Sequence, residues 1–185
     1  HSPAHSRNRR CQARRHREHG EILCPGTFST LGFDAATVNP FLGHDSLEPF
    51  INYKDKGIFI LALTSNPGAS DFQRTLCGGA SLYDLIAQKA KQWNIYGNIG
   101  VVVGATYIGE IKRIRSICLN MPLLIPGVGA QGGSLAAAVK YGADARGENA
   151  IITISRQIIY ASKDKKDFAR AARDMAEKSR NEINA

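Results

Sequence analysis

Cysteine is scarce in this chain, and its spacing excludes the common metal and redox motifs. Four cysteines occur among 185 residues, and Cys77 and Cys118 lie too far apart for such a motif. We expect these two thiols to act as small buried hydrophobic groups. Histidine is equally rare after residue 24, where His44 stands alone, and one histidine forms neither a metal site nor a catalytic triad. The sequence therefore predicts no metal site.

Long hydrophobic runs are also absent. No stretch approaches the roughly 20 apolar residues that span a membrane, and residues 1–24 lack the apolar segment of a secretory signal. We therefore expect no membrane contact and a cytoplasmic location.

The positive charge of the chain is unevenly distributed. The formal net charge is +8, and residues 1–24 hold six arginines against two glutamates. The rest of the chain carries the balanced charge of an ordinary solvated surface. We expect no nucleic-acid partner, and the alternative of a nucleic-acid binder depends on the basic N-terminal segment alone.

After residue 27, short apolar runs alternate with segments of helical period, which is typical of βα units. The predicted strands are 34–39, 57–65, 99–106, 121–127 and 150–156. The predicted helices are 47–53, 81–93, 107–118, 134–142 and 163–182. This pattern predicts an α/β fold, and five such units fit either an open doubly wound sheet or part of an eight-unit barrel.

The loops after the predicted strands indicate a phosphate site. Ligands meet the carboxyl ends of parallel strands in both architectures. The glycines of GVGAQGG allow backbone N–H groups to approach an anion ahead of a helix. One unit later, Arg156 offers a fork of hydrogen-bond donors.

The same glycines also match a dinucleotide motif. Gly127, Gly129 and Gly132 fit G-x-G-x-x-G between a predicted strand and a predicted helix. The acidic residue expected about 20 residues further on is replaced by Ser155 and Arg156, although an arginine could favour a 2′-phosphate. An NADP-dependent oxidoreductase therefore stays an alternative function. The dinucleotide motif usually opens a domain, whereas here it opens the fourth of five βα units.

Four segments of the chain, in their order and spacing, resemble one protein family. The segments DAATVNPFLGHDSLEPF, ALTSNPGASDFQ, LLIPGVGAQGG and ISRQIIYAS resemble the C-terminal portion of orotidine 5′-phosphate decarboxylase in its longer bacterial form. The resemblance covers residue 27 to the C-terminus. It implies strands four to eight of a (β/α)₈ TIM barrel that acts as a homodimer. It also implies decarboxylation of orotidine monophosphate (OMP) to uridine monophosphate (UMP) in pyrimidine biosynthesis, without cofactor or metal.

The resemblance assigns substrate-binding roles to five residues. Ser65 matches the serine that hydrogen-bonds the pyrimidine, and Gln131 matches the glutamine of the closing loop. Arg156 matches the arginine that grips the phosphate, with the backbone N–H of Ser155 beside it. Pro126 shapes the same loop.

The catalytic motif of the family is missing from the chain. The family carries a stretch like D-A-K-R-x-D-I-G at the end of strand three, where a carboxylate crowds the departing CO₂ and a lysine stabilises and protonates the carbanion. No such stretch precedes residue 27. The charged runs 54–56 and 163–167 are expected to be solvated. Ser134 replaces the usual aspartate of the family, and it can still cap the next helix. We therefore predict no catalytic residue and an inactive chain.

The N-terminal segment has an explanation at the level of codons. With permissible codons, the bases that encode residues 8–25 spell IVDAKRGDIGNTAKFYA when they are read one position later. This is the missing motif. The wobble bases are free choices, but most bases of the shifted codons are constrained. We infer a frameshift near residues 24–27.

Two regions follow from this interpretation. Residues 1–26 form an irregular basic segment from out-of-frame translation, and residues 27–185 form the C-terminal part of a decarboxylase barrel. A barrel without three strands exposes two sheet edges, which favours aggregation or dimerisation. A non-catalytic fragment that binds a phosphate ligand is the main alternative function.

Overall fold

The computed structural model describes residues 24–129 and 132–185, and a parallel sheet of five strands forms its centre. The strands lie side by side in chain order: β1(Ala35–Val38), β2(Gly57–Leu63), β5(Ile99–Val103), β6(Leu123–Pro126) and β7(Ala150–Thr153). Each neighbouring pair is parallel. All five carboxyl ends therefore lie along one edge of the sheet.

Helical segments follow every strand of the five-stranded sheet, as the sequence predicts. They are η2(Pro40–Leu42) and α2(His44–Ile51) after β1, α3(Ala69–Phe72) and α4(Leu82–Trp93) after β2, α5(Ile108–Cys118) after β5, α6(Leu135–Gly142) after β6, and α7(Arg156–Ile159) and α8(Phe168–Ile183) after β7. A short π-helix, η1(Pro25–Thr30), precedes β1, and a hairpin of β3(Leu76–Cys77) and β4(Ala80–Ser81) precedes α4. The hairpin, α3 and α7 were not predicted, because elements of two to four residues are too short to show a period.

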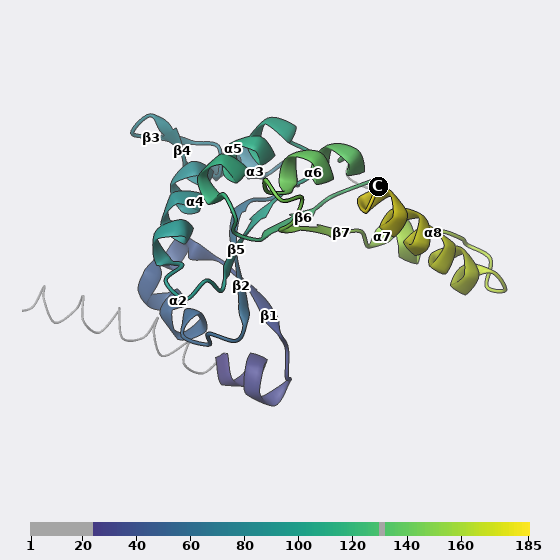
Figure 1. Cartoon of the computed structure of the whole chain (residues 1–185), viewed down its shortest axis with the longest axis horizontal. Coiled ribbons are helices and arrows are strands. Elements are labelled where there is room, and N and C mark those ends of the chain that lie inside the picture. Colours follow the sequence, from purple (N-terminus) through teal and green to yellow (C-terminus); the bar gives the residue numbers. More distant parts are fainter. Residues whose placement is uncertain (1–23, 130–131) are drawn as a thin grey trace, which may run out of the picture.

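The helices cover one face of the sheet. Figure 1 shows α2, α4, α5 and α6 along the same side of the strands. A doubly wound sheet carries helices on both faces and reverses its strand order at a switch point. Neither feature occurs in the part of the chain that the structure describes. The sequential order and the one-sided helices identify a partial (β/α)₈ barrel, which decides between the two architectures that periodicity left open.

Side chains alternate between the helix-covered face and an opposite, open face. On the helix side, Ile58, Ile60, Leu123 and Ile125 are fully buried. The residues between them, including Phe59 and Leu124, are only half-buried. We call the face that carries the second set the open face. The period of two in burial along β2 and β6 matches the pleat of a strand and fixes which of their residues point toward the barrel axis, whereas β5 is buried throughout.

One of the two cysteine expectations is wrong. Cys118 is buried at the end of α5, and this burial raises the pKa of its thiol to about 11. Cys77, expected to be buried, is exposed. The reason is that it lies in the β3–β4 hairpin, which projects from the sheet (Figure 1). Cys24 is buried in the core with a pKa raised by burial to about 11.

Candidate functional site at the carboxyl edge of the sheet

Ser65 lies just beyond β2 and packs against the end of β5. A Cβ atom on Gly104 would lie 2.7 Å from the Ser65 backbone nitrogen and Cα, so this approach requires glycine. The Gly104 N–H donates to the Leu63 carbonyl at 2.8 Å, and the Thr106 hydroxyl donates to the Ser65 carbonyl at 3.5 Å. The Ser65 backbone is therefore held from the neighbouring strand, and its half-buried side chain lies at the carboxyl edge.

A glutamine that sequence reasoning missed fixes the residue before Ser65. The Thr64 N–H donates to Gln73 Oε1 at 2.7 Å, and Gln73 Nε2 donates to the Thr64 hydroxyl oxygen at 3.0 Å. These bonds close the TSNPGASDFQ segment into a loop around α3. The sequence shows only that a polar residue, Gln73, ends this segment. Its pairing with Thr64 could not be predicted, because it depends on the fold of the loop.

Arg74 ties the same loop to the helix of the next unit. Its Nη2 lies 2.7 Å from Glu110 Oε1, and its guanidinium lies over the Tyr107 ring at 3.8 Å. Cation–π and ionic contacts of this kind stabilise partly buried arginines. The loop after β2 is therefore anchored at both of its ends.

The glycine-rich loop after β6 is closed by its own hydrogen bonds. The N–H of Gly129 donates to Gly133 O at 3.0 Å, that of Gly132 donates to Gly129 O at 2.8 Å, and that of Gly133 donates to Gly127 O at 3.3 Å. Gly127, Gly129 and Gly132 have φ of 96°, 72° and 85°, a region that favours glycine. The expectation that these glycine amides face an anion is corrected for Gly129, Gly132 and Gly133, because the tight turn uses their donors internally.

Pro126 connects this loop to its neighbours on both sides. Its carbonyl accepts the Ala105 N–H at 2.7 Å, and it pairs with Thr153 of β7. The Ser134 hydroxyl accepts the Ala137 N–H at 3.3 Å, which confirms the predicted cap of the following helix. Gln131 lies outside the described residues, so its role stays a prediction.

Ser155 and Arg156 follow β7 at the start of α7 and are exposed. The Ser155 carbonyl accepts the N–H groups of Ile158 and Ile159 and starts α7. Within the described residues, no carboxylate or carbonyl binds the Arg156 guanidinium. Among these residues, its donors are therefore open to a ligand.

The candidate residues form a row rather than a cluster. Pro126 ends β6, and the Ser155–Arg156 pair follows the neighbouring strand β7 at the start of α7. Ser65 lies two strands away from Pro126, with β5 between β2 and β6. At about 4.8 Å per strand, the row from Ser65 to Ser155 is about 14 Å long. This length suits a ligand with an anion at one end and a polar ring at the other.

A second missed residue, Gln157, packs onto the glycine-rich loop. Its Oε1 occupies the space that a Cβ on Gly129 would need. Beside it, a cleft of about 220 Å³ lies between this loop, α7 and α8, and Ser179 is a buried polar residue in its lining. Gln157 follows Arg156 directly, yet nothing in its sequence spacing distinguishes it from a surface residue.

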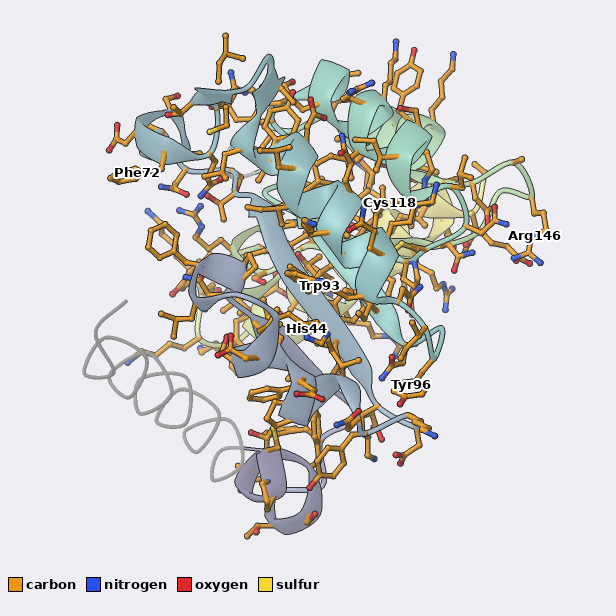
Figure 2. All side chains as sticks on the ribbon, turned by 90° about the vertical axis from the view of Figure 1, so that its left-hand side faces the viewer. His44, Phe72, Trp93, Tyr96, Cys118 and Arg146 are labelled. Atoms are coloured by element: carbon orange, nitrogen blue, oxygen red, sulfur yellow. The ribbon has the colours of Figure 1, made fainter. Side chains whose placement is uncertain are left out.

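The other charged and metal-binding candidates lie away from this edge. The 54–56 run precedes β2 at the opposite edge of the sheet, where Lys56 Nζ lies 3.5 Å from Asp34. Figure 2 shows His44 beside Trp93, with 5.2 Å between the ring centroids. Among the described residues, no group of three or more His, Cys, Asp or Glu side chains is arranged to hold a metal ion. The helices in this part of the chain are all too short or too polar to cross a membrane.

Comparison of sequences identifies relatives. Residues 24–172 match the model of the "Orotidine 5'-phosphate decarboxylase / HUMPS family". The orotidine 5′-phosphate decarboxylase of Cupriavidus necator is 51% identical over 152 residues, which are 82% of this chain and 56% of that protein. The protein of the same name from Dehalococcoides mccartyi is 52% identical over 158 residues, 83% of this chain and 58% of its own length. The chain therefore spans somewhat more than half of these curated relatives.

Comparison of folds identifies the same family as comparison of sequences. The OMP decarboxylase of Leishmania donovani superposes with a TM-score of 0.78 at 34% identity, over 90% of this chain and 64% of that one. The UMP synthase of the same organism gives 0.80 at 38% identity, over 90% and 36% of the two chains. With the matching motifs at the carboxyl edge, these similarities show that the chain belongs to the orotidine 5′-phosphate decarboxylase / HUMPS family.

Proposed function

We propose that this chain is the substrate-binding portion of an orotidine 5′-phosphate decarboxylase, and that it holds the nucleotide without decarboxylating it. The observation that carries the proposal is the row of Ser65, Pro126, Ser155 and Arg156 along one sheet edge, in segments that resemble the family. The related decarboxylases carry the substrate class in their names.

Each residue has a distinct part in binding. The Arg156 guanidinium, free of protein partners among the described residues, pairs with the phosphate, and the Ser155 N–H donates beside it. The Ser65 hydroxyl hydrogen-bonds the pyrimidine, while Gly104 and Gln73 hold its backbone in place. The resemblance adds Gln131 as a bridge between phosphate and base.

The chain lacks the charged side chains that the family uses to break the bond between C6 and the departing CO₂. Decarboxylation at C6 requires a cation that stabilises the developing carbanion and then returns a proton. Lys54, Asp55 and Lys56 precede β2, a strand of seven residues, and are therefore separated from Ser65 by about 20 Å. No lysine of this chain matches the family motif, so the expected turnover of the chain alone is at background level.

The frameshift proposal explains this loss. The family match begins at residue 24, where the basic composition of residues 1–23 ends. Sequencing of the coding DNA across codons 20–30 tests it. An extra or missing base relative to an intact relative supports the proposal, and a clean frame in independent clones overturns it.

Homodimerisation and a cytoplasmic location also stay predictions. Two aromatic side chains at the carboxyl edge support self-association, because Phe41 is 83% exposed and Phe72 is 70% exposed. Figure 2 shows Phe72 at the periphery of the molecule. Sedimentation equilibrium of the chain would measure the dimer.

Binding and turnover test the proposed function directly. We expect calorimetry to detect UMP binding, and Arg156→Ala to weaken it by about 10–100-fold through loss of a charged phosphate contact. Arg173→Ala is the matched control, because Arg173 lies on α8 in an exposed pair with Glu177. Equal losses in the two variants, or tighter binding of NADPH than of UMP, would contradict the assignment. Turnover of OMP by the purified chain would overturn the predicted inactivity.

A further inference from the structure

The cleft between the glycine-rich loop and α8 contains a buried hydroxyl group. Ser179 of α8 is 6% exposed and lies in the lining of this cleft, whose volume is about 220 Å³. Within residues 24–129 and 132–185, no group hydrogen-bonds the Ser179 side chain. A hydroxyl can both donate and accept, and burial without a partner costs free energy. The cleft therefore offers a polar ligand a hydrogen-bonding group that is already withdrawn from bulk water.

The apolar part of the lining comes from three elements. The C-terminal end of α8 lies beside α6 and α7 (Figure 1). Val128 of the glycine-rich loop is buried, and Leu135 of α6 and Met175 of α8 are half-buried. Apolar walls with a few polar groups are the usual lining of a small-molecule site. The three side chains thus provide a surface on which an uncharged ring can pack.

The polar part of the lining favours a neutral ligand. Gln157 of α7 is exposed at the rim, and its amide can donate and accept as the Ser179 hydroxyl can. The two charged side chains of the lining, Lys178 and Glu182, lie 3.9 Å apart and form an ion pair. Because their charges largely cancel, an anion gains little net attraction here.

The volume of the cleft limits the ligand to a small molecule. It equals the volume of about seven water molecules, at about 30 Å³ for each. Sites for drug-sized molecules usually measure about 300–1,000 Å³, so a whole nucleotide is too large. A single heterocyclic ring is of the right size.

We propose that this cleft is a second binding site, for a small neutral ring that carries cyclic amide groups, which is the chemistry of a free nucleobase. The ring packs against Met175 and its apolar neighbours, and the N–H and C=O groups of its edge pair with Ser179 and Gln157. Neither Ser65 nor Arg156 lies in the described lining. The second site is therefore separate from the proposed nucleotide site and does not depend on the proposed function.

The two methionines of the chain give a direct test. Met175 lines the cleft, whereas Met121 is buried outside the described lining. The full chain with ¹³C-labelled methionine methyl groups is titrated with uracil and followed by NMR. Uracil should shift the Met175 signal and leave the Met121 signal in place, with a dissociation constant of about 0.1–1 mM, as expected for so small a ligand.

A matched ligand tests the hydrogen bonds of the ring. 1,3-Dimethyluracil keeps the ring but lacks both N–H donors, so it should bind the cleft at least about five-fold less tightly than uracil. A Met175 signal that uracil does not move, or that the two ligands move at equal concentrations, overturns the site.

Two substitutions on α8 locate the contact. Ser179→Ala removes the buried hydroxyl and should weaken uracil binding by about 5–10-fold. Arg173→Ala is the matched control, because Arg173 lies on the same helix in an exposed pair with Glu177, outside the described lining. Both variants should keep the circular dichroism of the parent chain, since alanine favours helix. Equal uracil affinity in the two variants would contradict the assignment of the site.

Failure of this site and failure of the proposed function are separable. Arg156→Ala should weaken UMP binding and leave the response of Met175 to uracil unchanged. Loss of that response in Arg156→Ala would tie it to the nucleotide site and would overturn a separate second site. Absence of UMP binding in the parent chain would contradict the proposed function and leave the uracil result intact.

Discussion

The central strand β5 and the terminal strand β7 belong to one sheet but lie in different environments. All five residues of β5 are buried, whereas no residue of β7 is fully buried. Both strands are apolar in sequence, so their composition does not explain the contrast. The difference is that β5 has neighbours on both sides and β7 has only β6 among the described residues. In this partial barrel, burial is a property of position in the sheet.

The largest expected effect is the loss of stability caused by a cavity between α5 and β5. Ile114 of α5 is fully buried against the sheet, and Ile114→Ala should lower the free energy of unfolding by about 2–5 kcal/mol. Ile151→Ala on β7 should cost about 1 kcal/mol or less, because half of that side chain already contacts solvent. Urea denaturation measures both. Equal costs would break the contrast between centre and edge.

A smaller effect is expected where β5 meets the candidate site. Gly104→Ala puts a methyl group against the Ser65 backbone and should cost about 1–3 kcal/mol and weaken UMP binding. Gly109→Ala is the control, because nothing lies within 4 Å of its added Cβ in α5, and alanine there should stabilise the helix by about 0.5–1 kcal/mol. Thermal unfolding measures the stability of the two variants, and calorimetry measures their affinity for UMP, so together they test whether the packing of Ser65 against Gly104 supports binding. Unchanged UMP affinity in Gly104→Ala would contradict it.

The smallest effect concerns the loop before β7. The Asn149 side chain donates to the Asp144 carboxylate at 2.8 Å, backbone N–H groups of Glu148 and Arg146 add to this, and the pKa of Asp144 falls to about 2. A carboxyl whose pKa is lowered by folding stabilises the protein above its unfolded pKa of about 3.9. That contribution should be lost as the pH falls from about 4 toward 2. Chemical denaturation across this range should give a shallower pH dependence for Asp144→Asn than for the parent, and identical slopes would contradict the assignment.

Several features of the fold and site were predictable from local pattern. The short apolar runs and the helical period between them located all five βα units, because both patterns reflect local backbone geometry. The hydroxyl of Ser134 in front of an apolar helix was sufficient to predict its cap. The motifs around Ser65, Pro126 and Arg156 were sufficient to predict the family.

Other features were decided only by the tertiary structure. The exposure of Cys77, the bond between Gln73 and Thr64, and the position of Gln157 against Gly129 all involve loops that no period describes. The Arg115 guanidinium lies on a helix with a charged pattern, yet it donates to carbonyls of Met121, Gly142 and Asn149 in three separate segments.

The amino-acid sequence by itself determined the order and type of the five main βα units and the family motifs. Both depend on patterns of neighbouring residues. Only the tertiary structure decided that the helices cover one face, that the glycine amides after β6 bind within their own loop, and that β1 and β7 stand at the two ends of the described sheet. Those outcomes depend on contacts between residues far apart in the chain, where packing and hydrogen-bond geometry, rather than local preference, determine the arrangement.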